Sequence, residues 1–439
     1  MSKTKDSHHD AAGRGCPEYL NLSRRRFLGL GAGAVTAAAL PAWLPRVAYA
    51  DTHASRDVVV SIFLRGGADA LTLCVPFLED NYYRLRPTQA IPRPDSGAPN
   101  RALSLDGRFG IPQAMAPLME AYGAGHLAMV HACGQPKANR SHFDAMHVVE
   151  VGHGEPPGSL ATGWLGRHLQ QSAPTHSDGV LRALALGFGL PRTLVGAPDT
   201  LPVNDPVNFD FRGRVETADA RQATLEAMYA DLERPLGAAA RNTFRTLSLL
   251  RQLDVTNYQP AGGGAYPEDP FGQALRSAAA LIRADAGIEA IAIDIGGWDT
   301  HERQGSTDGE LNALMASFAG GLAAFHADLQ SAGRDDVTTV ALSEFGRNVF
   351  ENASGGTDHG HGGVLFALGQ NVQGGRVLTD WPGLEDELLY EGQDLKITID
   401  YRDVLSELLE HRLGAADAGA IFDDPGYVAQ SRGLFAPRV

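Results

Sequence analysis

The sequence predicts an α/β fold in which helices cover both faces of a doubly wound, mostly parallel β-sheet. Its short apolar runs are continuous, which is typical of strands buried on both faces rather than of half-exposed strands. Segments with helical periodicity separate these runs, so right-handed crossovers would join neighbouring parallel strands. Polar, glycine-rich segments border the runs, and ligands in such sheets bind beyond the carboxyl ends of the strands.

The apolar runs that we expect to form strands lie at residues 58–64, 127–132, 183–186, 288–295, 338–342 and 364–368. Helical periodicity is clearest at residues 160–169, 217–232, 238–253, 272–284, 311–330 and 401–412, and a further helix is expected at 144–151. No apolar run separates the two helices within residues 217–253, and a loop rich in proline and glycine follows at 259–267. We therefore expect a helical insertion within one α/β domain that spans residues 51–439.

Composition and charge narrow the class of protein. The chain has 439 residues, of which 44% are apolar and 20% are charged, as in globular proteins. Its formal net charge is −15, and residues 1–50 hold seven basic and three acidic residues, so the remainder carries −19. A body this acidic argues against nucleic acid as a partner, because nucleic-acid binding needs a basic face.

The N-terminal segment, residues 1–50, has the pattern of an export signal. Arg24 and Arg25 precede an apolar stretch at residues 30–40, and the small residues Ala48 and Ala50 mark a cleavage site. Paired arginines in this position resemble the signal read by the twin-arginine export machinery, which indicates a periplasmic or secreted protein. An uncleaved amphipathic anchor is the alternative. No other stretch is long and apolar enough for a permanent membrane span.

Two cysteines, Cys74 and Cys133, remain after the signal segment. An oxidising compartment would permit a disulfide between them. Each ends an apolar run, however, so two buried free thiols are the favoured alternative.

Five His and Asp side chains lie close together in two glycine-rich segments. Asp299 and His301 alternate along an extended segment and so face the same side, while Asp358, His359 and His361 follow one another within four residues. Mixed nitrogen and oxygen ligands favour zinc or manganese, whereas calcium, the further candidate, prefers more oxygens. The alternative is a hydrogen-bonded network that stabilises the loops without a metal.

Ser141 lies near the expected start of the helix at 144–151. It could simply cap that helix. The catalytic alternative uses the same geometry, because a helix N-terminus stabilises anions, Arg140 can bind two oxygens, and a metal lowers the pKa of a hydroxyl. Arg65 and Arg347 could neutralise further oxyanion charge, or could instead pair with the surplus carboxylates.

Six ordered blocks of sequence, at residues 63–69, 139–143, 163–167, 296–301, 343–347 and 356–363, resemble the family called domain of unknown function 1501. Members of that family are typically exported with a twin-arginine signal. The family looks distantly related to the alkaline phosphatase and sulfatase superfamily, so the resemblance implies an alkaline-phosphatase-like fold.

The superfamily pattern also implies roles for individual residues. The resemblance places its nucleophile at Ser141 and a metal-binding Asp–His pair at Glu344 and Phe345, of which phenylalanine cannot bind a metal. The implied metal ligands are Asp69, Asp299, His301, Glu344, Asp358, His359 and His361. The chain lacks the formylglycine motif of sulfatases, which slightly favours phosphate over sulfate.

We therefore expect an exported, metal-dependent hydrolase of phosphate or sulfate esters, acting on a small-molecule or polymer-borne substrate. The alternative is a non-catalytic exported binding or assembly protein that retains the fold. Phe345, at a position where the superfamily has a ligand, favours this alternative.

Overall fold

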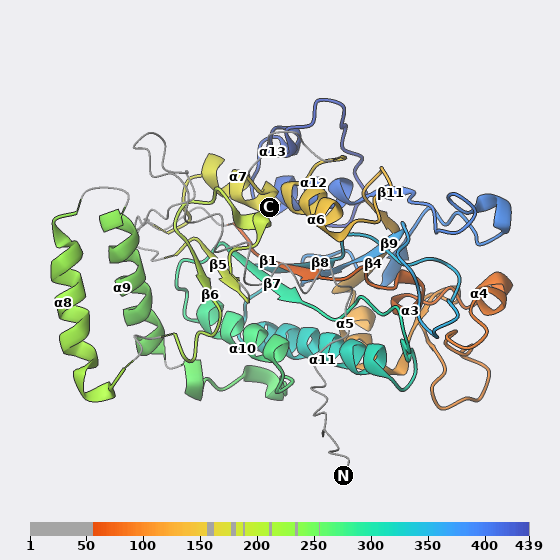
Figure 1. Ribbon diagram of the computed structural model, residues 1–439, viewed down its shortest axis with the longest axis horizontal. Helices are drawn as coiled ribbons and strands as arrows, with labels where there is room; N and C mark the ends of the chain where they lie inside the picture. The colour runs from red at the N-terminus through yellow and green to blue at the C-terminus, as the bar shows by residue number, and fades with distance from the viewer. Residues whose placement is uncertain are drawn as a thin grey trace, which may run out of the picture.

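The computed structural model of the chain describes residues 56–438, except for 156–161, 177–180, 188, 210–212, 233–235 and 254. A central sheet lies between two layers of helices (Figure 1). The expected export signal lies outside the described residues, so its assignment stays a prediction. Within the described residues, no helix is long and apolar enough to span a membrane.

The main sheet contains nine strands: β1 Val58–Leu64, β4 Leu127–Gly134, β5 Ala183–Leu186, β6 Thr200–Val203, β7 Ala290–Ile295, β8 Val337–Leu342, β9 Gly363–Leu368, β10 Arg376–Leu378 and β11 Ile399–Asp400. Their order is β10-β4-β9-β8-β1-β7-β5-β6, with β11 also paired to β4. A separate two-stranded sheet joins β2 Leu103–Ser104 to β3 Gly110–Ile111. All six predicted strands are present, which confirms the doubly wound, mostly parallel sheet.

Strand β9 is the exception to the parallel order, since it runs antiparallel to both β4 and β8. A parallel return from β8 would need a crossover, usually a helix. Residues 343–362 form no helix, so the chain returns along the same edge of the sheet. The loop before β9 therefore lies at the edge where β1, β7 and β8 end.

The two faces of β1 contribute to different hydrophobic cores. Val60 and Ile62 lie in the core under α5 Met119–Gly123, α10 Pro270–Arg283 and α11 Glu310–Ser331. Val59 and Phe63 lie in the opposite core under α6 His142–Val151, α7 Trp164–Gln171, α12 Tyr401–His411 and α13 Ala418–Phe422. Figure 1 shows these two helical layers on either side of the sheet. Burial on both faces explains why the strands are continuously apolar.

The predicted helical insertion corresponds to α8 Ala218–Ala230 and α9 Leu236–Leu253. The two helices lie at one end of the molecule, beside β5 and β6 rather than over the sheet (Figure 1). At the opposite end are the short helices α3 Ala70–Leu73 and α4 Asp80–Leu85.

Cys74 and Cys133 are both buried free thiols. Burial raises the pKa of each thiol well above its ordinary value. The structure thus agrees with the favoured alternative of two buried thiols rather than a disulfide.

Candidate metal centre

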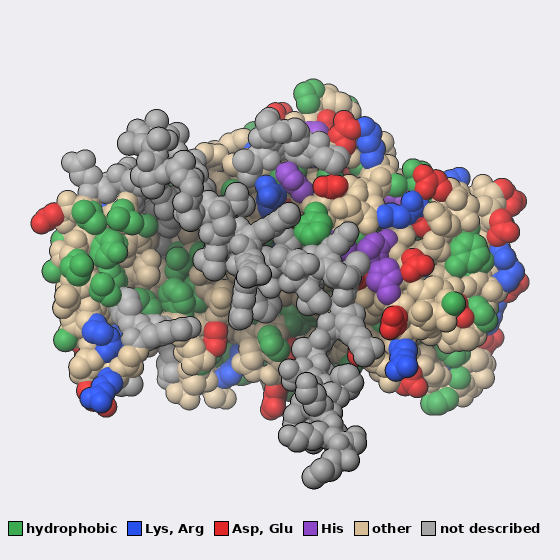
Figure 2. All heavy atoms as spheres, in the orientation of Figure 1, with side chains coloured by type: hydrophobic (Ala, Val, Ile, Leu, Met, Phe, Trp, Pro, Cys, Tyr) green, Lys and Arg blue, Asp and Glu red, His purple; other side chains and the backbone are tan. Residues whose placement is uncertain are grey.

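Loops from distant parts of the chain bring a group of histidines and acids together beyond the carboxyl ends of the parallel strands. Asp299 and His301 follow β7, His359 precedes β9, and His142 is the first residue of α6. Histidine side chains gather at the surface in Figure 2, in the region where Figure 1 places the ends of β4 and β9. His301 and His359 are partly exposed, so solvent reaches this group of side chains.

Three imidazole nitrogens converge on one carboxylate oxygen of Asp299. Its Oδ1 lies 3.0 Å from Nε2 of His301, 3.1 Å from Nε2 of His359 and 3.5 Å from Nε2 of His142. The two Nε2 atoms of His301 and His359 are 2.9 Å apart. His142, Asp299 and His359 each offer a ligand atom within 4.8 Å of the others, a spacing that suits one metal ion.

The opposite nitrogen of each imidazole, Nδ1, faces a group that can only accept a hydrogen bond. These acceptors are Glu344 Oε1 for His142 at 2.8 Å, Asp358 Oδ1 for His301 at 3.0 Å and the carbonyl of Arg140 for His359 at 2.9 Å. Each Nδ1 therefore carries a proton, and in a neutral imidazole this leaves the lone pair on Nε2. Metal-binding histidines usually have such a partner on their other nitrogen.

The converging lone pairs need a cation among them. Three neutral imidazoles would otherwise direct their lone pairs at a carboxylate, an arrangement that repels unless a proton or a metal ion intervenes. The Nε2 atom of His142 is buried and has no hydrogen-bond partner among the described residues. The donor set of imidazole nitrogens and a carboxylate oxygen fits zinc or manganese.

The pKa shifts of Asp299, His142 and His301 also favour positive charge at this centre. Burial raises the pKa of Asp299, but its contacts with the three imidazoles and the charge of Arg347 outweigh it and hold this pKa well below its usual range. Burial lowers the pKa of His142, but its contacts with Asp299 and Glu344 prevail and raise it to about 9. The hydrogen bond to Asp299 raises the pKa of His301. The carboxylate of Asp299 thus favours a positive charge at the point where the three imidazoles meet.

Arg347 links the loops around the site. Its fully buried guanidinium donates to the carbonyls of Gly67 at 2.6 Å, Thr357 at 2.8 Å, Gly66 at 2.5 Å and Trp298 at 2.8 Å. It also donates to Asp299 Oδ1 at 2.7 Å. All three guanidinium nitrogens are thus occupied by protein acceptors, so Arg347 positions Asp299 rather than facing solvent.

The other two predicted oxyanion-binding arginines also pair with protein groups. Arg65 forms ion pairs with Glu150 at 3.0 Å and Asp294 at 2.8 Å. Arg140 contacts the buried carboxylate of Asp394, and its carbonyl accepts the hydrogen bond from His359 described above. For Arg65 the structure therefore shows the alternative interpretation, pairing with a surplus carboxylate.

Asp69 lies in a second, separate network instead of among the converging ligands. It is buried and forms an ion pair with Arg86 at 2.5 Å. Its Oδ2 also accepts from Thr72 Oγ1 at 2.6 Å and from Gln304 Nε2 at 2.7 Å. Gln304 in turn accepts from Thr357 Oγ1 at 2.7 Å, so this network stabilises the loops that carry the histidines.

His361 is buried beside Tyr390, with ring centroids 4.7 Å apart, and is not one of the residues whose ligand atoms converge. Burial lowers its pKa to about 4. The ring of Phe345 packs 5.0 Å from the rings of both His142 and His359.

Ser141 occupies the N-cap position of α6, directly before His142. Its backbone is extended there, yet its side chain makes no capping hydrogen bond. The loop is stabilised instead by Asn139, whose Oδ1 accepts from the backbone N–H of Ser141 at 2.9 Å. The half-buried hydroxyl is therefore not committed to helix capping.

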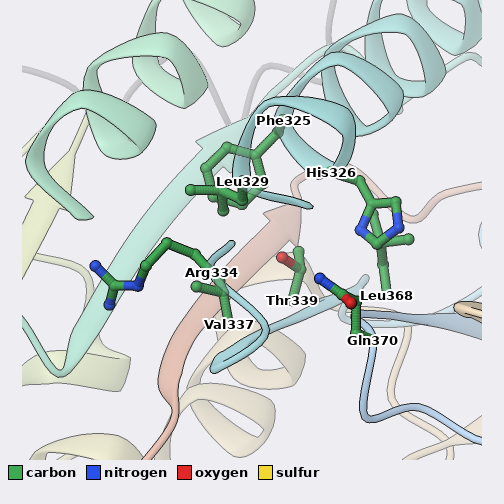
Figure 3. A pocket seen from close by; sticks show the side chains of 8 residues that line it. All are labelled: Phe325, His326, Leu329, Arg334, Val337, Thr339, Leu368 and Gln370. Atoms are coloured by element: carbon green, nitrogen blue, oxygen red, sulfur yellow. The ribbon is translucent and has the colours of Figure 1, made fainter. Parts of the chain in front are cut away.

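A small hollow elsewhere lies at the opposite edge of the sheet. His326, Arg334 and Gln370 line it near the amino end of β8, as Figure 3 shows. It has hardly enough room for one water molecule, and it is unrelated to the converging histidines.

The fold and the site define an α/β protein with a candidate centre for a divalent metal at the carboxyl edge of its sheet. A family model described as "Protein of unknown function (DUF1501)" matches residues 129–420. The chain belongs to this family, as the sequence blocks predicted. No curated protein matches the sequence.

Two solved structures are distantly similar to the chain. A sulfatase, PsFucS1 from Pseudoalteromonas sp., is 12% identical, with a TM-score of 0.38 over 87% of this chain and 74% of that one. The lipoteichoic acid synthase LtaP from Listeria monocytogenes is 10% identical, with a TM-score of 0.27 over 75% of this chain and 68% of that one. Likenesses of this size leave the activity to be argued from the chain's own residues.

Sequence reasoning brought together Asp299, His301 and His359 but missed His142 as a candidate ligand. His142 stands within the block 139–143, next to the predicted nucleophile Ser141. His142 lies two residues before the expected helix at 144–151 and follows a buried strand, and an imidazole at such a position was the signal that could have identified it.

Proposed function

We propose that this protein is an exported, metal-dependent hydrolase of phosphate or sulfate esters. The observation that carries the proposal is the convergence of three imidazole Nε2 atoms on Asp299 at a solvent-accessible edge of the sheet. His142, Asp299, His301 and His359 would hold the ion, with zinc or manganese favoured over calcium. A bound ion of this kind polarises an ester oxygen and favours ionisation of a nearby nucleophile.

Ser141 is the proposed nucleophile. Its hydroxyl is free of a capping bond, next to His142, and at the start of a helix whose exposed N–H groups favour anionic oxygens. Attack on the ester forms a bond from Oγ to phosphorus or sulfur and breaks the bond to the alkoxide, which takes up the hydroxyl proton of the serine and leaves as the alcohol. Water then attacks phosphorus or sulfur of the seryl ester, which releases phosphate or sulfate and returns a proton to Oγ.

The substrate class rests on the motif resemblance to the alkaline phosphatase and sulfatase superfamily. The remaining side chains of the site have positioning roles in this proposal. Arg347 fixes Asp299, and the network around Asp69 fixes the loop that follows β7. Export to the periplasm or beyond the cell is part of the same proposal, and it rests on the arginine pair at residues 24–25.

A non-catalytic binding or assembly protein is the second candidate function. The observation that favours it is that Arg65, Arg140 and Arg347 all pair with protein groups. An enzyme acting on phosphate or sulfate normally presents such cations to its substrate. Phe345, packed on two of the histidines, points the same way.

The test begins with metal analysis of the full-length protein, purified from cells that export it. The metal-loaded protein is then assayed against aryl phosphate monoesters, aryl phosphate diesters and aryl sulfates, with zinc, manganese or calcium supplied. We expect turnover of one ester class that disappears with chelation. If the fully loaded protein turns over none of these esters, the hydrolase proposal is wrong and the binding function takes its place.

A further inference from the structure

We infer that the centre is built for one metal ion, with Glu344 and Asp358 as positioning residues that hold His142 and His301 by their outer nitrogens. The inference deepens the proposed function and rests on its metal centre. It departs from the sequence prediction, in which both carboxylates bind metal directly.

Glu344 already uses both of its oxygens. Oε1 accepts from Nδ1 of His142 at 2.8 Å and from the backbone N–H of Gly66 at 2.9 Å, while Oε2 accepts from Ser343 Oγ at 2.8 Å. The side chain is fully buried, so a carboxylate that turned toward a metal would leave Nδ1 of His142 and the N–H of Gly66 without this acceptor. The Nε2 atom of His142, in contrast, is buried, has no hydrogen-bond partner among the residues that the structure describes, and lies 3.5 Å from Oδ1 of Asp299.

Asp358 has the same relation to His301, from the solvent side. Its Oδ1 accepts from Nδ1 of His301 at 3.0 Å and from Asn352 Nδ2 at 3.1 Å. Asn352 also donates to the carbonyl of His301 at 2.9 Å, so the same amide fixes both partners. Because the Asp358 carboxylate is mostly exposed, it can be changed with little effect on packing.

Around this centre, the described part of the chain offers no second set of ligands. Phe345 is buried against His142 and His359, and a side chain at Gly67 would come within 2.4 Å of its ring. Asp69 is neutralised by Arg86. Among the described residues, the trio of His142, Asp299 and His359 is the one group whose spacing suits a metal.

The test measures metal binding directly. The full-length protein is stripped with chelator and titrated with Co²⁺ and Zn²⁺, and X-ray absorption counts the imidazoles around the bound ion. We expect one ion per chain. Glu344→Gln and Asp358→Asn should keep that stoichiometry and the wild-type imidazole count, with affinity lowered about 10- to 100-fold. His142→Ala should remove one imidazole from the coordination shell.

Glu289→Gln is the matched control. Glu289 is a buried carboxylate bonded to Arg182 at 2.6 Å, and it precedes β7 whereas Asp299 follows that strand. This variant should bind metal like the wild type. If Glu344→Gln does not fold, the exposed Asp358→Asn variant carries the test of a positioning role.

Two ions per chain would overturn the one-metal centre. Affinity within twofold of the wild type in both carboxylate variants would overturn their positioning role, and so would a loss of binding as complete as in His142→Ala. Failure of the ester assays would contradict the proposed hydrolase yet leave these binding results unaffected, so the two ideas fail separately.

Discussion

Replacing Arg347 with lysine separates two roles for this side chain. If Arg347 organises the loops, the variant loses stability; if it acts on substrate, the variant loses activity at unchanged stability. Arginine donates through five N–H groups, whereas lysine has three on a single nitrogen. Arg347→Lys therefore cannot reach all of Gly66, Gly67, Trp298, Thr357 and Asp299. At about 1–3 kcal/mol for each buried acceptor left without a donor, the loss of two such bonds costs about 2–6 kcal/mol.

The cost is large beside a total stability of about 5–15 kcal/mol. We expect Arg347→Lys to lower the free energy of unfolding, measured by urea denaturation, by about 2–6 kcal/mol and to weaken metal binding. Arg192→Lys, the same change at an exposed position, should alter stability by less than about 0.5 kcal/mol.

A loss below about 1 kcal/mol in Arg347→Lys would refute the reasoning that this side chain organises the loops. If activity fell by orders of magnitude at unchanged stability, Arg347 would instead act on substrate, as the sequence predicted.

Four further predictions test the site, the core and the export signal. His359→Ala should lose tightly bound metal while staying folded, and a full metal complement in this variant would show that His359 is not a ligand. Ser141→Gly should lower turnover by orders of magnitude with metal content unchanged and stability altered by only about a few tenths of a kcal/mol, because glycine serves almost as well at an N-cap; retained activity would require another nucleophile. Burial lowers the pKa of His131 to about 4. Its neutral form is therefore favoured in the folded state, and stability should fall as the pH drops from about 6.5 to 4, by up to about 3 kcal/mol. In His131→Gln this part of the decline should vanish from urea denaturation at pH 7 and 4.5, and an unchanged decline would assign it to other groups. Arg24→Lys combined with Arg25→Lys should leave the protein in the cytoplasm by cell fractionation, whereas normal export would contradict a twin-arginine signal.

The sheet was predictable where burial on both faces produced a continuous apolar run. The three strands of the main sheet that were missed are short and lie at or near its edges. Strand β6 carries Pro202, which a central strand would not tolerate, while β10 and β11 have three and two residues. The direction of β9 was also missed, because periodicity says nothing of direction. The helix-free segment at 343–362 was the available signal.

The site was predictable as a group of residues but not in its division of roles. Residues that border strand ends must meet at the edge of a parallel sheet, which is why Asp299, His301 and His359 converge. Whether a carboxylate faces the centre or the outer nitrogen of a histidine depends on side-chain direction. For this reason Glu344 and Asp358, expected as ligands, contact Nδ1 atoms instead. Their proposed roles await the metal titration.

The charges around the site explain why a divalent ion suits it better than a network of protons. Asp299, Glu344 and Asp358 contribute three negative charges and Arg347 one positive charge, so three neutral imidazoles leave a net charge of −2. A divalent cation neutralises this and uses every Nε2 lone pair. Protonation could also supply two charges, but the Nε2 hydrogens would then crowd the single oxygen of Asp299, which already accepts from Arg347. A metal bound by His142, Asp299, His301 and His359 would thus balance the charge of the surrounding carboxylates and use the lone pairs that meet at Asp299.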